Sequence, residues 1–167
     1  MRARRVASLA ACLFVALLVV SCDGGIVYDK YKPVDVAGWW KDDTVSFSIP
    51  PLRGEADYRE MIGIRISNGY LYSNIGLIVQ LQAFSSYGPS DNASKVRQDT
   101  IEIKLFDDKG NALSTGITHY TYQHPLTSIG LGKGDSLQVK VWHNMRTEML
   151  PGVDDVGFII YSTEPTR

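Results

Sequence analysis

The sequence has only two cysteines in 167 residues, Cys12 and Cys22, and both lie within its first 22 positions. The chain beyond residue 22 therefore contains no thiol that could form a disulfide, bind a metal or act as a nucleophile. A domain built from that part must be held together by its core alone. A chain of this size buries roughly two thirds of its unfolded surface, which is enough for one core.

Clusters of positive charge are also missing beyond the first five residues, where Arg2, Arg4 and Arg5 lie. The formal net charge is −1, from 17 basic and 18 acidic residues, so the chain becomes more acidic once those arginines are removed. This balance argues against nucleic acid as a partner and against peripheral attachment to anionic lipid headgroups.

No apolar run is long enough for a transmembrane helix. The chain is uncharged from Val6 to Val20, which is 15 residues, and this run ends in Asp23-Gly24-Gly25. A spanning helix needs about 20 apolar residues. A short apolar run behind a basic start is typical of a secretory signal peptide, so we predict a signal peptide over residues 1–21.

The end of this run resembles the bacterial lipobox, with Val19-Val20-Ser21 before Cys22. The resemblance implies that Cys22 is diacylated on sulfur, for example with palmitate, becomes the first residue after cleavage and is then acylated on its amine. Each buried methylene contributes about 0.8 kcal/mol, so several chains anchor firmly. We therefore expect residues 22–167 to be lipid-anchored in the cell envelope, in the outer membrane, through a short tether. The alternative is an ordinary signal peptide with an incidental cysteine.

The mature chain alternates apolar and polar residues with a period of two. The segments with this pattern are residues 45–49, 62–66, 75–82, 101–105, 137–142 and 156–161. The last is apolar on both faces, which predicts a central strand. Turn residues separate the segments, and no window shows a helical period. We predict an all-β fold, a single antiparallel β-sandwich domain over residues 22–167, with residues 84–99 as a long surface loop.

Residues that could carry catalysis or bind metal are present but are not arranged in known motifs. The histidines are His119, His124 and His143, without the spacing of a zinc site. Three pairs of adjacent aspartates occur, Asp42-Asp43, Asp107-Asp108 and Asp154-Asp155, and neighbours in an extended strand point to opposite faces. The turn 107–111 lacks the ligand pattern of a calcium loop. We expect no catalytic residues, no metal and no cofactor.

Aromatic residues offer a possible partner contact. Tyr70 and Tyr72 are spaced by two, which would place them on one side of a strand, whereas Trp39 and Trp40 are adjacent and point to opposite sides. Together with Asn74 these are our candidate contact residues. Such rings can grip a protein partner or stack on sugars. The alternative is that they complete the core.

Three segments resemble the gliding motility lipoprotein GldH family of the Bacteroidota. The resemblance lies in an aromatic-rich start that leads to Trp40-Lys41-Asp42, in the block from Ile64 to Leu81 with its Tyr-Ser-Asn, and in the closing strand from Gly152 to Ile160. One departure occurs at Gly110–Gly116, where this chain lacks the Trp and one Gly of the family pattern.

The resemblance implies a non-enzymatic envelope lipoprotein of the gliding machinery and, by association, of the type IX secretion apparatus. Its expected partners are the membrane, through acylated Cys22, and other envelope proteins that the sequence does not identify. It supplies no active-site residues. The alternative hypothesis, from the sandwich and its aromatic residues, is a carbohydrate-binding surface lipoprotein.

Overall fold

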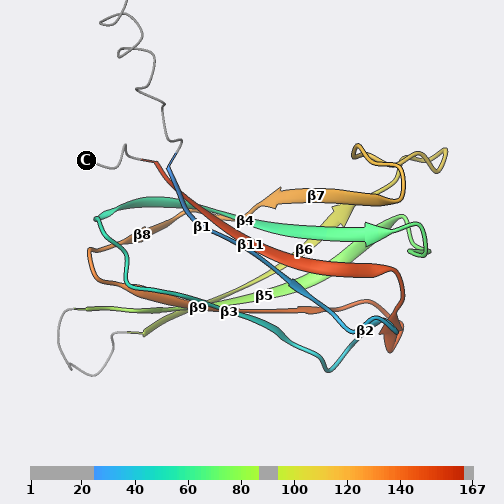
Figure 1. The fold of residues 1–167 in the computed structure, drawn as a ribbon. Helices are drawn as coiled ribbons and strands as arrows, with labels where there is room; N and C mark the ends of the chain where they lie inside the picture. Colours follow the sequence, from blue (N-terminus) through green and yellow to red (C-terminus); the bar gives the residue numbers. More distant parts are fainter. Residues whose placement is uncertain (1–24, 87–93, 164–167) are drawn as a thin grey trace, which may run out of the picture.

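The computed structural model describes residues 25–86 and 94–163, and it shows two antiparallel β-sheets packed face to face (Figure 1). These residues contain no helix, and hence none long and apolar enough to cross a membrane. The predicted all-β sandwich is confirmed. The predicted signal peptide and Cys22 lie outside the described residues.

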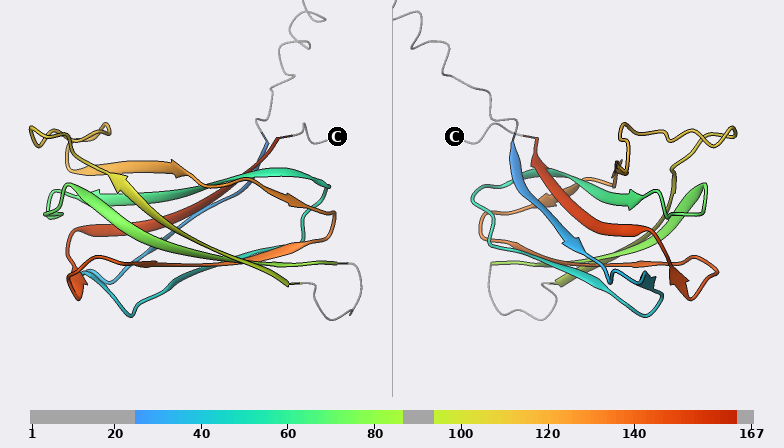
Figure 2. Two further views of the ribbon diagram at one scale, coloured as in Figure 1. Left: turned by 180° about the vertical axis from the view of Figure 1, so that it is seen from behind. Right: turned by 45° about the vertical axis from the view of Figure 1, so that its right-hand side comes forward.

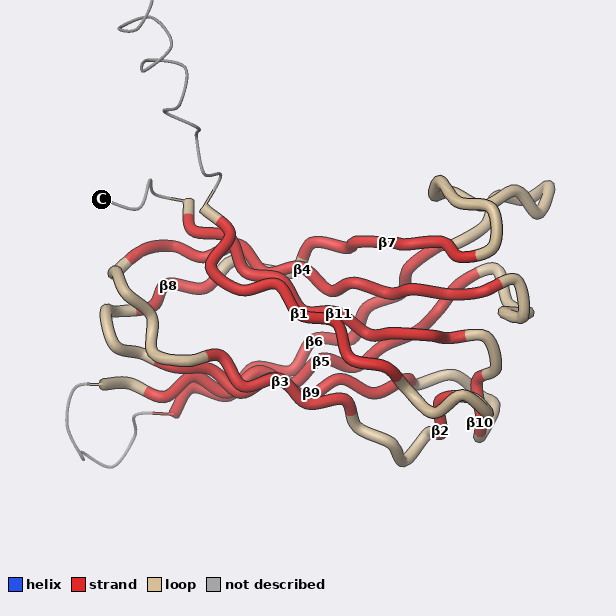
Figure 3. The backbone as a smooth tube through the Cα atoms, in the orientation of Figure 1, coloured by secondary structure: helices blue, strands red, loops and turns tan. Residues whose placement is uncertain are grey.

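The strands divide into two layers and a small ribbon (Figure 3). The first sheet has the order β1 (Ile26–Pro33), β11 (Val153–Ser162), β4 (Ala56–Ser67), β7 (His119–Pro125), and β8 (Ile129–Leu131) pairs with the first residues of β4. The second sheet has the order β3 (Val45–Ile49), β9 (Ser136–His143), β5 (Asn74–Phe84), β6 (Ser94–Lys104). The ribbon consists of β2 (Trp39–Trp40) and β10 (Met149–Leu150).

Strand β11 has the central position that its sequence predicts. It lies between β1 and β4, and its inward residues Phe158 and Ile160 are fully buried. Ile159, whose side chain alternates to the other face, is fully buried as well. A strand buried on both faces has no position for polar residues, which explains the continuous apolar run.

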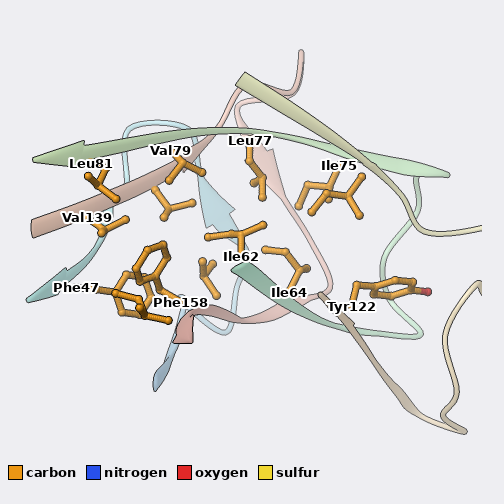
Figure 4. Packing of buried hydrophobic residues seen from close by; sticks show 14 of the residues in the cluster. Phe47, Ile62, Ile64, Ile75, Leu77, Val79, Leu81, Tyr122, Val139 and Phe158 are labelled. Carbon is orange, nitrogen blue, oxygen red and sulfur yellow. The ribbon is translucent and has the colours of Figure 1, made fainter. Parts of the chain in front are cut away.

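The core fills the space between the sheets with the apolar halves of the alternating strands (Figure 4). Ile62 and Ile64 of β4 face Leu77 and Val79 of β5 across this space, and all four are buried. Near the β3 side the rings of Phe47 and Phe158 lie 6.0 Å apart. Burial of such side chains contributes roughly 1.5 to 3 kcal/mol each relative to exposure.

The predicted surface loop over residues 84–99 is wrong in its second half, because β6 begins at Ser94. Arg97 and Asp99 stand opposite the buried residues Leu81 and Val79 of β5, so charged side chains occupy inward positions. These charges break the apolar alternation from which a strand is recognised. Residues 87–93 lie outside the described part of the chain.

Strand β1 was not expected for the same reason. Lys30 and Lys32 stand opposite Phe158 and Val156, so they lie on the inward side of the strand. Within the described residues β1 pairs only with β11 and β6 only with β5, so both are edge strands. Inward charges on edge strands are a known device against edge-to-edge pairing.

The two ends of the sandwich carry different parts of the chain. The β4–β5 turn, the β6–β7 loop and the β2–β10 ribbon lie at one end (Figures 1 and 2). The start of β1 and the finish of β11 lie together toward the other end, where the Ser162 N–H donates to the Gly25 carbonyl at 2.6 Å.

Candidate contact surface

The two tryptophans of β2 occupy opposite environments, as their adjacency predicts. Trp39 has no exposed surface, its indole N–H donates to the Asp43 carbonyl at 3.0 Å, and its ring meets His143 edge-on at 5.4 Å. Trp40 is 48% exposed. Trp39 is therefore a core residue, and Trp40 is the one of the pair that is available to a partner.

His143 is a buried residue of the core. Its Nε2 lies 3.1 Å from the Trp39 carbonyl oxygen, and its Nδ1 is buried without a hydrogen-bond partner among the described residues. Burial lowers the pKa of this imidazole, which favours the neutral ring. No group of three or more His, Cys, Asp or Glu side chains in the described ranges is placed to hold a metal.

Tyr70, Tyr72 and Asn74 lie at the β4–β5 turn, and the two tyrosines are not in a strand. Tyr70 is buried, and its hydroxyl donates to the Asn74 carbonyl at 2.7 Å. Burial raises the pKa of Tyr70, so it stays neutral. Tyr72 is half-buried, with its ring 5.8 Å from that of Tyr70, and the Asn74 amide donates to Glu102. Tyr72 and Asn74 thus keep surface that a partner can reach, whereas Tyr70 belongs to the core.

Backbone hydrogen bonds join this turn to the β6–β7 loop. The Ser73 carbonyl accepts from the N–H groups of Leu105 and Phe106 at 2.8 and 3.1 Å, and the Asn68 N–H donates to the Thr118 carbonyl at 3.2 Å. The buried Tyr122 hydroxyl donates to the Leu105 carbonyl at 2.8 Å and supports the loop from below. We call residues 68–73 and 105–118 together the tip.

Three large aliphatic side chains of the tip face solvent. Leu71 is 76%, Leu113 54% and Ile117 89% exposed. Sequence reasoning did not select them because single aliphatic residues among turn residues show no period. A usable signal was present, since the sequence has no Lys, Arg, Asp or Glu from Ser67 to Ser86 or from Gly110 to Gly132.

The aspartates of the 107–111 turn serve the turn itself. Asp107 accepts hydrogen bonds from the N–H groups of Lys109 and Asn111, each at 2.8 Å, and from the Asn111 amide at 2.9 Å. The bonds from Asn111 lower the pKa of this carboxyl most. Asp108 pairs with Lys104 at 2.8 Å on the surface.

A charged cluster lies inside the sandwich, and no sequence pattern indicates it. Glu60, on the inward face of β4, has no exposed surface and forms an ion pair with Arg97 of β6. The Arg97 Nε also contacts Asp99 at 2.8 Å. Burial raises the pKa of Glu60 to about 7, against the lowering effect of Arg97. Because Glu60 is inaccessible to a substrate, the cluster has a structural role.

One hollow on the described surface is open to solvent. It has a volume of about 400 Å³ and lies between the end of β1 and the start of β3, where Lys32, Asp35, Asp43 and Thr44 are among its lining residues. The buried rings of Trp39, Tyr70 and Tyr122 offer no stacking surface for a sugar.

Comparison with known proteins gives relatives over nearly the whole sandwich. The family model described as GldH lipoprotein matches residues 26–160. The gliding motility lipoprotein GldH of Flavobacterium johnsoniae is 28% identical over 155 residues, which are 89% of this chain and 92% of that protein. The gliding motility lipoprotein GldH homolog of Christiangramia forsetii is 29% identical over 131 residues, 78% of this chain and 65% of that protein.

The similarity of this chain to solved structures is weaker than its similarity to these relatives. A crystal structure from Sulfurospirillum deleyianum is similar with a TM-score of 0.45 and 12% identity, over 82% of this chain and 98% of that chain. Such a likeness supports no argument about function. The family and the two relatives above are named as lipoproteins and not as enzymes.

Proposed function

The chain belongs to the GldH lipoprotein family, and on that premise we propose that it is a non-enzymatic, lipid-anchored component of the gliding motility and type IX secretion machinery, which acts through protein–protein contacts. The observation that carries this proposal is the family match over residues 26–160, which spans the sandwich from β1 into β11. The names of the two relatives support the link to gliding.

The proposal places the lipid on Cys22. Only Asp23 and Gly24 lie between Cys22 and Gly25, where the described chain begins, so three residue steps join the two positions. An extended segment of that length spans at most about 10 Å, so the start of β1 would lie next to the membrane surface. We place the anchor in the outer membrane.

The partner contact that we propose includes the accessible members of the expected set, which are Trp40, Tyr72 and Asn74. Half-exposed aromatic residues are frequent anchors of protein interfaces. Trp39 and Tyr70, which are buried, support these neighbours from the core.

Lipid labelling of cells tests the anchor. Labelled palmitate should enter the wild-type protein and the control variant Cys12→Ala, because Cys12 lies within the signal peptide, but it should not enter Cys22→Ala. The Cys22→Ala protein should leave the membrane fraction or stay uncleaved. Label in Cys22→Ala would contradict the lipobox interpretation.

Crosslinking in intact cells tests the partner. Affinity purification of the crosslinked wild-type protein should enrich components of the motility or secretion machinery, and Cys22→Ala should lose them because it is no longer held at the membrane. Enrichment of polysaccharide-uptake proteins instead would contradict the proposal and favour the carbohydrate-binding alternative.

A further inference from the structure

The tip presents an apolar surface that the fold does not use. Leu71, Leu113 and Ile117 all expose more than half of their surface, whereas the tyrosines beneath them are buried or half-buried. Single exposed aliphatic residues are ordinary on proteins, but these three lie on two loops that hydrogen bonds hold together at one end of the sandwich, so we treat them as one patch.

The same two loops are poor in charge. Apart from the turn at Asp107, Asp108 and Lys109, the residues of the tip carry no charged side chain. Depletion of charge is the feature that distinguishes the centre of a protein interface from other surface. A charged ligand would lose hydration at this patch and find no opposite charge, so the occupant must itself be apolar and uncharged where it touches.

The patch is held in one shape before any partner binds. The Ser73 carbonyl and the Asn68 amide group join the turn to the loop, and Tyr122 fixes Leu105 from below. Gly152, with a φ of +76°, brings the β10–β11 turn against the backbone of Gly69 and Tyr70. A preformed surface loses little conformational entropy on binding.

The position of the tip indicates that the patch contacts a protein and not the membrane in which the lipid anchor lies. Strand β11 runs from the tip to the Gly25 end. Its residue Val153 pairs with β4 near the tip, and its residue Ser162 lies beside Gly25. These two positions are nine residues apart, or about 30 Å of strand. With the proposed lipid on Cys22, a tether of two residues would keep the Gly25 end at the membrane, and the tip lies at the other end of the sandwich (Figure 2).

We propose that the tip, through Leu71, Leu113 and Ile117, docks onto an apolar, uncharged surface of another envelope protein. The inference deepens the proposed function and rests on it for the existence of an envelope partner. It differs from that proposal in assigning the contact to these three aliphatic side chains and in specifying the chemistry of the partner surface.

Site-specific photo-crosslinking in the native host tests this inference. A photoreactive amino acid is placed at Leu113 of the full-length protein and, as a control, at Val96, which is 57% exposed on β6 near its opposite end. Position 113 should give one discrete protein adduct that position 96 does not give. Leu71→Asp and Ile117→Asp should each reduce that adduct by at least about tenfold, because they place an unpaired charge in the contact.

The matched control is Val96→Asp, which should leave the adduct within about twofold, and unchanged melting temperatures of the purified domains should exclude unfolding. An adduct to lipid or to a second copy of the chain, or an adduct insensitive to Leu71→Asp, overturns the inference. Adducts to an envelope protein from Trp40 without any from the tip overturn it while sparing the proposed function. No protein adduct from any of these positions contradicts both.

Discussion

Glu60 and Arg97 form an ion pair that joins the two sheets of the sandwich from the inside, β4 on one side and β6 on the other. Glu60 is fully buried, and the Arg97 side chain keeps 26% of its surface exposed. One Glu60 oxygen, Oε1, has no hydrogen-bond partner within the described residues. A buried carboxyl with an incomplete set of partners titrates differently from an exposed one.

The first prediction concerns the pH dependence that Glu60 confers. Burial raises its pKa from 4.5 to about 7, so between these values the folded protein holds a proton that the unfolded chain releases. The contribution to stability is complete below pH 4.5 and is lost as pH rises toward 7, at no more than about 1.4 kcal/mol per pH unit. Urea unfolding of Glu60→Gln should show stability rising relative to wild type across that window. If the unfolding free energies of the wild type and Glu60→Gln changed in parallel with pH, Glu60 would not have the raised pKa.

Arg97→Met provides the complementary measurement. Removal of the guanidinium leaves Glu60 buried and unpaired, which should cost about 3 to 5 kcal/mol above pH 7 and less below it, where Glu60 takes up a proton. The double variant Glu60→Leu with Arg97→Met should recover most of that loss, because apolar pairs often replace buried ion pairs without penalty.

The second prediction concerns His143. Burial lowers the pKa of its imidazole, so its contribution to stability should change with pH in the direction opposite to that of Glu60. The unfolded chain takes up a proton near pH 6.5, while the folded protein does not until lower pH. Stability from the neutral imidazole is therefore present above pH 6.5 and lost as pH falls through the folded pKa. His143→Gln should flatten this loss in thermal unfolding scans from pH 7 to 5. Equal slopes for His143→Gln and the wild type would contradict this assignment.

The third prediction separates two neighbours in β2. Trp39→Ala should cost about 3 to 5 kcal/mol of unfolding free energy, because a fully buried indole and its contact with His143 are removed. Trp40→Ala should shift stability by about 0.5 kcal/mol or somewhat more, since this ring is 48% exposed. Equal losses in urea unfolding would show that Trp40 is also packing and not contact surface.

The fourth prediction concerns Tyr31, which lies flat across Gly157 and Gly63 on the outer face of the first sheet, with the Arg65 guanidinium 4.0 Å above its ring. A Cβ at Gly157 would overlap the Tyr31 ring, so Gly157→Ala should cost about 1 to 3 kcal/mol. Gly54→Ala, with nothing within 4 Å, is the control and should not destabilise the protein. A smaller penalty for Gly157→Ala in a Tyr31→Ala background, measured by thermal unfolding, would confirm the contact.

The segments whose inner faces are apolar, such as the second half of β6, could be predicted from sequence, whereas β1 and the first half of β6, which have inner charges, could not. Strand β11 is apolar on both faces because Ile159 is buried on the outside as well as Phe158 on the inside. In β1 and β6, charges such as Lys32 and Arg97 stand at inner positions, where alternation demands apolar residues. Only the three-dimensional pairing reveals that these side chains lie at the margins of the core.

The sequence indicates only in part where the candidate contact residues lie. Adjacency alone placed Trp39 and Trp40 on opposite sides, but the contact with His143, 104 residues away, decides which ring is buried. The spacing of Tyr70 and Tyr72 suggested a shared strand face, whereas both lie in a turn. Ile117 lies beside the β4–β5 turn because the Asn68 side-chain amide donates a hydrogen bond to the Ile117 carbonyl, and no sequence pattern indicates this contact.

The inward charges of β1 and β6 have a consequence for a lipoprotein that shares one leaflet with many copies of itself. Molecules confined to a plane collide side by side at high effective concentration, and that is the geometry in which free sheet margins join into a continuous array. Such joining would bring Lys30 and Lys32, or Arg97 and Asp99, close to their counterparts in the next molecule and strip them of water. The charges therefore disfavour edge-to-edge joining of copies through β1 or β6.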